Sequence, residues 1–227
     1  MRRFIRNNAI LYPIYIKWVV RNKSVVFPGA DTQLHLTGFQ RSSNTYCYNI
    51  IRSALPSLRL STHIHTIGSL KLAKCHGVPT ILLLRDPFAT CGSYMLKCGI
   101  AVNDTNLHDI LSDYYEYHDY AWNHKKHLNI ISFSNAISGP EYILRYVVKF
   151  LNLPMTDEEI QQAASVGQKL VEKKEALKKP EGSSLPTEER TRKKEVLRER
   201  FEQIPLYQEA QQIYEQLHAH ETLIGDL

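Results

Sequence analysis

The sequence predicts an α/β fold, a three-layer sandwich in which a central parallel sheet lies between two layers of helices. Two observations carry this prediction. Residues 34–55 have the pattern of a buried strand, a loop of small residues and a helix. Residues 78–84 form a continuous apolar run, Val-Pro-Thr-Ile-Leu-Leu-Leu, which is typical of a central parallel strand covered on both faces. Because strands and helices alternate along the chain, parallel pairing through right-handed crossovers is expected.

The composition is that of one globular domain over residues 1–227. Of the 227 residues, 43% are hydrophobic and 22% are charged, which is enough for one buried core. The net charge of +5 suits an anionic ligand but is too small to predict nucleic acid as a partner. Four cysteines without a C-x-x-C pair predict neither a metal site nor a disulfide framework, so a reducing, cytoplasmic location is expected.

Residues 1–30 form an N-terminal segment that mixes basic residues with apolar and aromatic ones. Its longest uncharged run, residues 7–16, is too short to span a bilayer, so no transmembrane segment is predicted. No small-residue cleavage site follows that run, which argues against a signal peptide. We expect the segment to pack on the domain, with peripheral contact at a membrane surface as the alternative.

The first loop has the chemistry of a phosphate cradle. A turn over residues 38–43 follows the first strand, and a helix is predicted from residue 44 to residue 55, where Pro56 ends it. Backbone N–H groups at such a helix start lack intrahelical partners and, with the positive end of the helix dipole, attract anions. The loop adds one guanidinium and several polar side chains, from Arg41, Ser42, Ser43, Asn44 and Thr45.

Short elements follow the cradle. Residues 58–61 are predicted to form a second strand, and residues 66–76 a helix that Gly77 closes, since glycine is favoured just past a helix end. The apolar run 78–84 is the third strand. Pro87 is placed to start the next helix, because its fixed φ suits the first helical position.

The carboxyl half is predicted to be mainly helical. Residues 103–126 form a helix and residues 128–133 a fourth strand. Ser138-Gly139-Pro140-Glu141 and Thr156-Asp157-Glu158-Glu159 match the capping-box pattern. They are expected to open helices that end near residues 151 and 177.

The last part of the chain contains the most linker-like stretch. Residues 178–194 place Pro and Gly between charge runs, and we expect a mobile basic loop there. Residues 195–217 are predicted to form helices separated near Pro205. No internal repeat stands out.

Two motifs resemble those of sulfotransferases that use 3′-phosphoadenosine 5′-phosphosulfate (PAPS). The family's 5′-phosphosulfate loop, commonly K/R-S-G-T/N-T-W, is similar to Arg41-Ser42-Ser43-Asn44-Thr45-Tyr46, with Ser43 in place of glycine. If that position requires φ > 0, the serine costs roughly 1 kcal/mol relative to glycine. The second motif, R-D/N-P-x-x-x-x-x-S-Y, is similar to the run from Arg85 to Tyr94, and the family's arginine and serine there hold the 3′-phosphate. Agreement of both motifs by chance is improbable.

The resemblance implies a sulfotransferase fold related to that of the P-loop nucleotide triphosphatases. It also implies an enzyme that moves the sulfuryl group of PAPS to an acceptor hydroxyl or amine by in-line displacement. No metal is required, and the product is 3′-phosphoadenosine 5′-phosphate (PAP). The expected acceptor is a small molecule or a glycan. The chain could act as a homodimer, and the resemblance does not decide this.

The resemblance also assigns roles to residues. His118 lies four residues before Trp122, as in the family's H-x-x-x-W pattern, and a histidine can accept a proton near neutral pH. Arg41 and His118 are therefore the expected catalytic residues. The family's basic segment R-K-G-x-x-G-D-W-K is absent, and Arg190 or Arg192 would replace it. The expected donor-binding residues are Arg41, Ser42, Ser43, Asn44, Thr45, Tyr46, Arg85, Ser93, Arg190 and Arg192.

Two other functions remain open. A P-loop phosphoryl-transfer enzyme would use ATP and magnesium, with Asp86 as the metal ligand. The first loop, however, lacks the second glycine and the lysine of G-x-x-x-x-G-K-[ST]. Alternatively, a non-catalytic module would bind nucleotides or polyanions through the basic stretch of residues 169–200.

Overall fold

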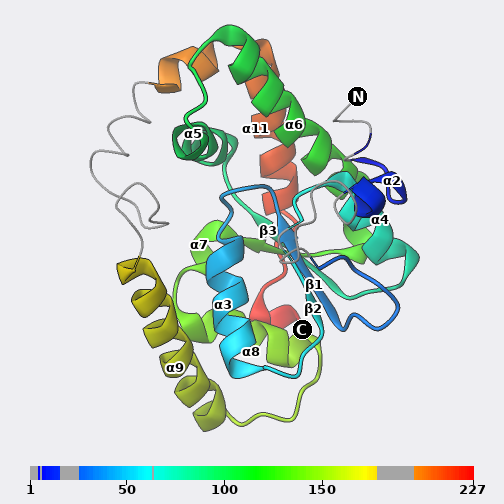
Figure 1. The fold of residues 1–227 in the computed structure, drawn as a ribbon, viewed down its shortest axis with the longest axis vertical. Helices are drawn as coiled ribbons and strands as arrows, with labels where there is room; N and C mark the ends of the chain where they lie inside the picture. The colour runs from blue at the N-terminus through cyan, green and yellow to red at the C-terminus, as the bar shows by residue number, and fades with distance from the viewer. Residues whose placement is uncertain (1–4, 6, 16–25, 63, 178–196) are drawn as a thin grey trace.

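The computed structural model describes residues 5, 7–15, 26–62, 64–177 and 197–227 (Figure 1). Within these residues a four-stranded sheet forms the centre, in the order β2-β1-β3-β4. Every strand pairs in parallel with its neighbour. The predicted α/β architecture with a central parallel sheet is therefore confirmed. The strands are β1 (Leu34–Gly38), β2 (Leu60–Ser61), β3 (Thr80–Leu84) and β4 (Asn129–Ser132).

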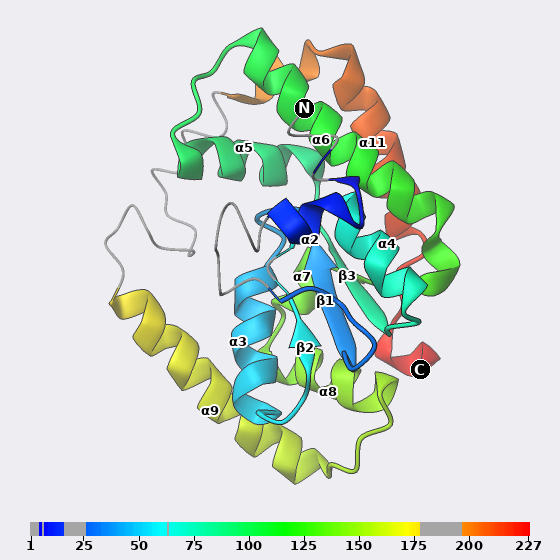
Figure 2. The ribbon, with the colours of Figure 1, turned by 45° about the vertical axis from the view of Figure 1, so that its right-hand side comes forward.

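Helices cover both faces of the sheet, as Figure 2 shows, with α3 and α9 on one side and α4, α6 and α11 on the other. The alternation of side chains along β3 explains the two layers. Ile81 and Leu83 join the apolar cluster on the α3 side, whereas Leu82 and Leu84 join the cluster on the α6 side. The helices of these layers are α3 (Asn44–Ala54), α8 (Pro140–Phe150) and α9 (Asp157–Ala176), then α4 (Ile67–Cys75), α5 (Pro87–Cys98), α6 (Asp104–Asn123) and α11 (Pro205–His218).

Most element boundaries lie within two residues of those predicted. The second strand is shorter than expected, because only two residues of 58–61 pair with β1. Residues 197–202 are helical before α11, and the predicted mobile loop at 178–194 lies outside the described residues. Across the described part of the chain, no helix is long and apolar enough to cross a membrane. Smaller elements are α2 (Leu11–Tyr15), α7 (Phe133–Ala136), η2 (Lys125–His127) and η4 (Ile224–Asp226).

One predicted capping box is wrong. Helix α8 takes Gly139 as its N-cap, with Pro140 at the first helical position and no side-chain cap. The Ser138 hydroxyl instead donates to the Asn135 carbonyl oxygen at 2.8 Å, because it closes the preceding turn. Ser138 therefore does not reach the start of α8.

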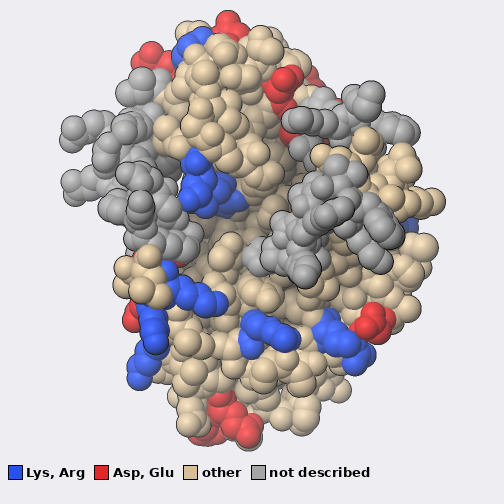
Figure 3. Space-filling model, viewed as in Figure 1, with Lys and Arg blue, Asp and Glu red and all other residues tan. Residues whose placement is uncertain are grey.

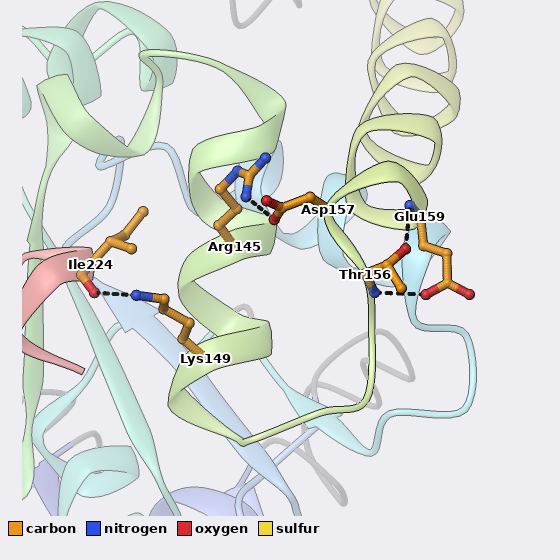
Figure 4. A network of polar contacts seen from close by, with 6 residues as sticks. All are labelled: Arg145, Lys149, Thr156, Asp157, Glu159 and Ile224. Carbon is orange, nitrogen blue, oxygen red and sulfur yellow. Dashed lines mark hydrogen bonds and ion pairs between the residues drawn. The ribbon is translucent and has the colours of Figure 1, made fainter.

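The other predicted capping box is confirmed at the start of α9 (Figure 4). The Thr156 hydroxyl accepts from the Glu159 backbone N–H at 3.2 Å, and the Glu159 carboxylate accepts from the Thr156 N–H at 2.8 Å. Next to the box, Asp157 forms an ion pair with Arg145 of α8. Lys149, one turn further along α8, donates to the Ile224 carbonyl oxygen at 3.2 Å. These contacts tie α9 and η4 to α8.

The pairing of β1 with β3 leaves no room for a side chain at Gly38. A Cβ there would lie 2.5 Å from the Leu83 carbonyl oxygen and 3.0 Å from the Leu83 Cβ. Because the nearest atom belongs to the backbone of a central strand, it cannot move aside without disturbing the sheet. Glycine is thus required where β1 ends.

We expect Gly38→Ala to lower the free energy of unfolding by about 1–3 kcal/mol, the usual cost of overpacking a buried site. Urea denaturation followed by circular dichroism would measure the change. Gly139→Ala is the matched control, since nothing lies within 4 Å of a Cβ there and its φ of 174° is extended backbone. An equal loss in both variants would contradict the steric explanation.

Candidate functional site

The two predicted motifs meet at the carboxyl edge of the sheet. β1 and β3 are neighbouring parallel strands, so the loops that follow them lie side by side. The Arg85 guanidinium (Nη1) donates to the Arg41 carbonyl oxygen at 2.6 Å, and Arg41 Nε donates to Ser93 Oγ at 3.1 Å. Three of the predicted donor-binding residues therefore form one contact chain.

Positive charge is concentrated at this edge. The Arg85 guanidinium stacks on the Phe133 ring, 3.8 Å from its centroid. Burial, and after it the charge of Arg41, lowers the pKa of Arg85 to about 10, so the Arg85 guanidinium stays charged at neutral pH. Figure 3 shows separate patches of Lys and Arg across the middle and lower part of the drawn face, and most Asp and Glu toward its top and bottom. An anion held between the two arginines would relieve their mutual repulsion.

The loop before α3 has a strained backbone. Arg41 and Ser43 have φ values of 72° and 63°, in the left-handed region that favours glycine. Each such residue costs on the order of 1 kcal/mol or more. The position where the family pattern has glycine is thus one of positive φ, and the serine takes that conformation. The Ser43 hydroxyl donates to the Ser42 carbonyl oxygen at 2.5 Å and does not cap α3.

The start of α3 also holds polar atoms without an internal partner. Ser42 Oγ and Asn44 Oδ1 are buried and make no hydrogen bond with the described residues. The Asn44 amide donates to the Phe39 carbonyl oxygen at 3.0 Å, which holds the turn. With no side-chain cap on α3, the first-turn N–H groups keep their capacity to bind an anion. The residues present therefore fit a phosphate group.

The last two residues of the motif differ in their surroundings. Thr45 is exposed on the first turn of α3. Tyr46 is half-buried, and its hydroxyl donates to the Gln168 side chain of α9 at 3.5 Å. Burial raises the pKa of Tyr46 to about 12, so the phenol stays neutral. The hydroxyl of Tyr46 is therefore engaged by α9.

Two tyrosines of α6 hold the ends of the central strands. The buried Tyr114 donates its hydroxyl to the Arg85 carbonyl oxygen at 2.7 Å. The Thr37 hydroxyl donates to the Ile64 carbonyl oxygen, so it accepts from the Tyr117 hydroxyl at 2.9 Å. Burial raises the pKa of both tyrosines, which keeps these donors protonated. Helix α6 thereby positions the backbone from which Arg85 projects.

His118 lies close to the loop but is fully enclosed. Its Nδ1 donates to the Tyr114 carbonyl oxygen at 2.8 Å, so Nε2 is the basic nitrogen, and Nε2 is buried without a partner among the described residues. The ring lies 6.1 Å from Phe39, measured between centroids. Burial lowers the pKa of His118 to about 4, so it is neutral at pH 7. As a base it would have to be uncovered, and its role stays a prediction.

A second histidine at this edge was given no role by the sequence. His65 Nδ1 donates to the Gly38 carbonyl oxygen at 2.6 Å, which makes Nε2 its basic nitrogen. His65 is only half-buried, unlike His118. Its position soon after the second strand is the signal that could have marked it, since the carboxyl ends of parallel strands share one edge.

The carboxylate of Asp86 is used in structural hydrogen bonds. One carboxylate oxygen caps α5 by accepting from the Ala89 N–H at 2.8 Å, and the other accepts from the Gln211 amide at 3.2 Å. Both oxygens are engaged, so magnesium binding at Asp86 would compete with these bonds. No group of three or more His, Cys, Asp or Glu that could hold a metal ion occurs among the residues described. The remaining predicted donor-binding residues, Arg190 and Arg192, lie outside them.

Two cavities formed by described residues lie away from the candidate site. A cavity of about 250 Å³ lies at the opposite edge of the sheet, where β3 begins, and is lined by Lys74, His124 and other residues. Another, of about 390 Å³, lies beside β2 and is lined in part by Arg52 and Arg59. Neither is lined by the contact chain of arginines and serine.

Comparisons with known proteins show no family for this chain. No protein-family model matches the chain, and no curated protein matches it. Among solved structures, mouse sulfotransferase SULT7A1 complexed with PAP is similar to it, with 12% identity and a TM-score of 0.48. The match covers 85% of this chain and 91% of the mouse chain. A likeness this distant carries no argument about function.

The buried histidines predict that acid destabilises the fold. Burial lowers the pKa of His35, on β1, to about 3 and that of His118 to about 4, against 6.5 in the unfolded chain. Between these values the unfolded chain binds more protons than the folded one, so the free energy of unfolding falls as the pH falls below about 6.5. At pH 5.0 we expect a loss of about 2 kcal/mol for each histidine relative to pH 7.5.

Urea denaturation at the two pH values measures this loss. His118→Phe keeps an aromatic ring among its neighbours and should show a smaller pH dependence than the unmodified protein. His108→Gln is the control, because it removes an exposed histidine from the same helix. An unchanged pH dependence in His118→Phe would mean that His118 is already protonated in the folded state at pH 5.0.

Proposed function

We propose that this chain is a sulfotransferase that moves the sulfuryl group of PAPS to an acceptor hydroxyl or amine and releases PAP. The contact chain Arg85–Arg41–Ser93 carries the proposal. It joins the two loops whose sequences resemble the 5′-phosphosulfate and 3′-phosphate motifs, although the contacting residues are 44 and 52 positions apart. Motif resemblance and spatial contact are separate observations, and both support the same site.

The donor supplies an activated sulfuryl group and a phosphate that gathers negative charge as the sulfuryl group leaves. We assign Arg41 and the first-turn N–H groups of α3 to that phosphate, where donors already in place stabilise developing charge. Arg85 and Ser93 are assigned to the 3′-phosphate. Ser42, Ser43, Asn44, Thr45 and Tyr46 complete the 5′ side, and Arg190 or Arg192 would close over the donor.

The acceptor is proposed to be a small alcohol, which includes glycans. Its hydroxyl must lose a proton as the new bond to sulfur forms, so a base is needed beside the loop. His118 is the first candidate for this base, as the sequence suggested. His65 is the second candidate, because its ring bonds the end of β1 and is not enclosed.

The first test is calorimetric titration, without magnesium, with PAP and with ADP. We expect PAP to bind much more tightly than ADP, because only PAP carries a 3′-phosphate. Arg85→Ala should weaken PAP binding by about ten- to a hundredfold, since a hydrogen bond to a charged group is worth roughly 1.5–3 kcal/mol.

Arg52→Ala is the matched control for this titration, because it removes the same charge from the last turn of α3, at the far end of the helix. It should leave PAP binding unchanged. Equal affinity for PAP and ADP, or no binding of either, would count against the sulfotransferase and favour a different anion-binding role.

The second test separates the two histidines. His118→Asn and His65→Asn are compared for PAP release from PAPS in the presence of a panel of phenols and sugars. Loss of the general base should lower turnover by about a hundredfold or more while PAP binding persists. If neither variant slows turnover, both assignments are wrong and the base lies elsewhere.

A further inference from the structure

Helix α2 presents an apolar face to solvent. Ile10, directly before the first residue of α2, and Leu11 and Ile14 within it are 72%, 40% and 51% exposed. Ile14 lies four residues after Ile10 and three after Leu11, so the three side chains lie on one side of a helical turn. The opposite side is held: Tyr12 packs edge-to-face on Phe27, with ring centroids 5.7 Å apart. We call the three aliphatic residues the α2 face.

The orientation of α2 is fixed by polar contacts as well. Asn8 Oδ1 accepts from the backbone N–H groups of Ile10 and Leu11, each at 2.9 Å. Lys71 of α4 donates to the Asn7 carbonyl oxygen at 3.3 Å, and Figures 1 and 2 both draw α2 beside α4. The segment is therefore anchored with its aliphatic side chains outward. Three large aliphatic side chains grouped in water mark a surface that binds something apolar.

The charge of the same segment indicates what it binds. Residues 1–30 contain six Lys and Arg and no Asp or Glu. The whole chain has 28 Lys and Arg against 23 Asp and Glu, which leaves 22 against 23 outside this segment. All of the net positive charge thus belongs to the stretch of sequence that carries the α2 face.

Another exposed aliphatic group lacks this charge. Val166 and Leu170 on α9 and Leu177, its C-cap, are 50%, 41% and 80% exposed. That helix, however, mixes lysines with acidic residues along its length. The two groups expose similar aliphatic side chains in stretches of sequence that differ in charge, so they can be compared directly.

We propose that the α2 face inserts into the surface of a membrane rich in anionic phospholipid. Burial of aliphatic side chains in the acyl region is favourable, and each Lys or Arg that reaches an anionic surface adds about 1 kcal/mol. Tyr15, on the same helix, suits the polar–apolar boundary of a bilayer. Helix α2 lies beside α4, and α4 begins two residues after His65 of the candidate site. Attachment through α2 would therefore bring the candidate site near the lipid surface.

Co-sedimentation of the full chain with vesicles tests the proposal. We expect binding to vesicles of phosphatidylcholine with about one third phosphatidylserine, and much weaker binding to phosphatidylcholine alone. Added salt should weaken the binding, since it screens the basic residues. The variant Ile10→Gln/Leu11→Gln/Ile14→Gln should lower the vesicle-bound fraction at least about tenfold.

The matched control is Val166→Gln/Leu170→Gln/Leu177→Gln, which removes as many exposed aliphatic side chains from α9 and should bind as the unmodified chain does. A second variant, Arg2→Gln/Arg3→Gln/Arg6→Gln, changes charge alone and should lose binding to anionic vesicles. Circular dichroism confirms that each variant is folded. The proposal is overturned if the unmodified chain ignores anionic vesicles, if the α2 variant binds them fully, or if the control loses as much.

Light scattering and PAP titration distinguish membrane binding from self-association and from the proposed function. If light scattering shows a dimer that the α2 variant dissociates, and the unmodified chain does not bind vesicles, the α2 face contacts a second copy and the membrane proposal fails. PAP titration of the same preparations keeps the proposed function separate. The α2 variant should bind PAP as tightly as the unmodified chain does, whatever the vesicle result.

Discussion

The candidate site depends on the close parallel pairing of β1 with β3 at Gly38. Gly38 pairs with Leu83, and only a residue without a Cβ allows that approach. The approach sets the two following loops side by side, so that Arg85 reaches the Arg41 backbone and Arg41 reaches Ser93. Without this pairing the arginines would belong to separate surface loops.

Helix α6 keeps these loops in place from the side. Tyr114 and Tyr117 lie in its buried face. Their hydroxyls donate hydrogen bonds to Arg85 and Thr37, at the ends of the two strands. Asp86 contributes from the other direction by capping α5 and bonding α11 through Gln211. The guanidinium of Arg85 is thus supported by a rigid core, which is the condition for a site whose donors are in position before a ligand arrives.

The site also holds features that cost stability. Two non-glycine residues take left-handed backbone, and two guanidinium groups lie together. Ser42 Oγ and Asn44 Oδ1 are buried without a hydrogen-bond partner in the described part of the chain. Each is unfavourable for an isolated fold, yet all lie within one loop and its immediate contacts. Such clustering is expected where a loop is shaped for a ligand rather than for packing. The exposed aliphatic face of α2 is a comparable feature at the surface.

The sequence by itself determined the α/β class, most helix and strand boundaries, and the two motifs that include Arg41, Arg85 and Ser93. These follow from periodicity, caps and short spacings, which depend on residues near one another in the chain. Only the tertiary structure decided that the motifs touch and that His118 is enclosed while His65 is not. Burial and contact depend on partners far apart in sequence, and no local pattern encodes them.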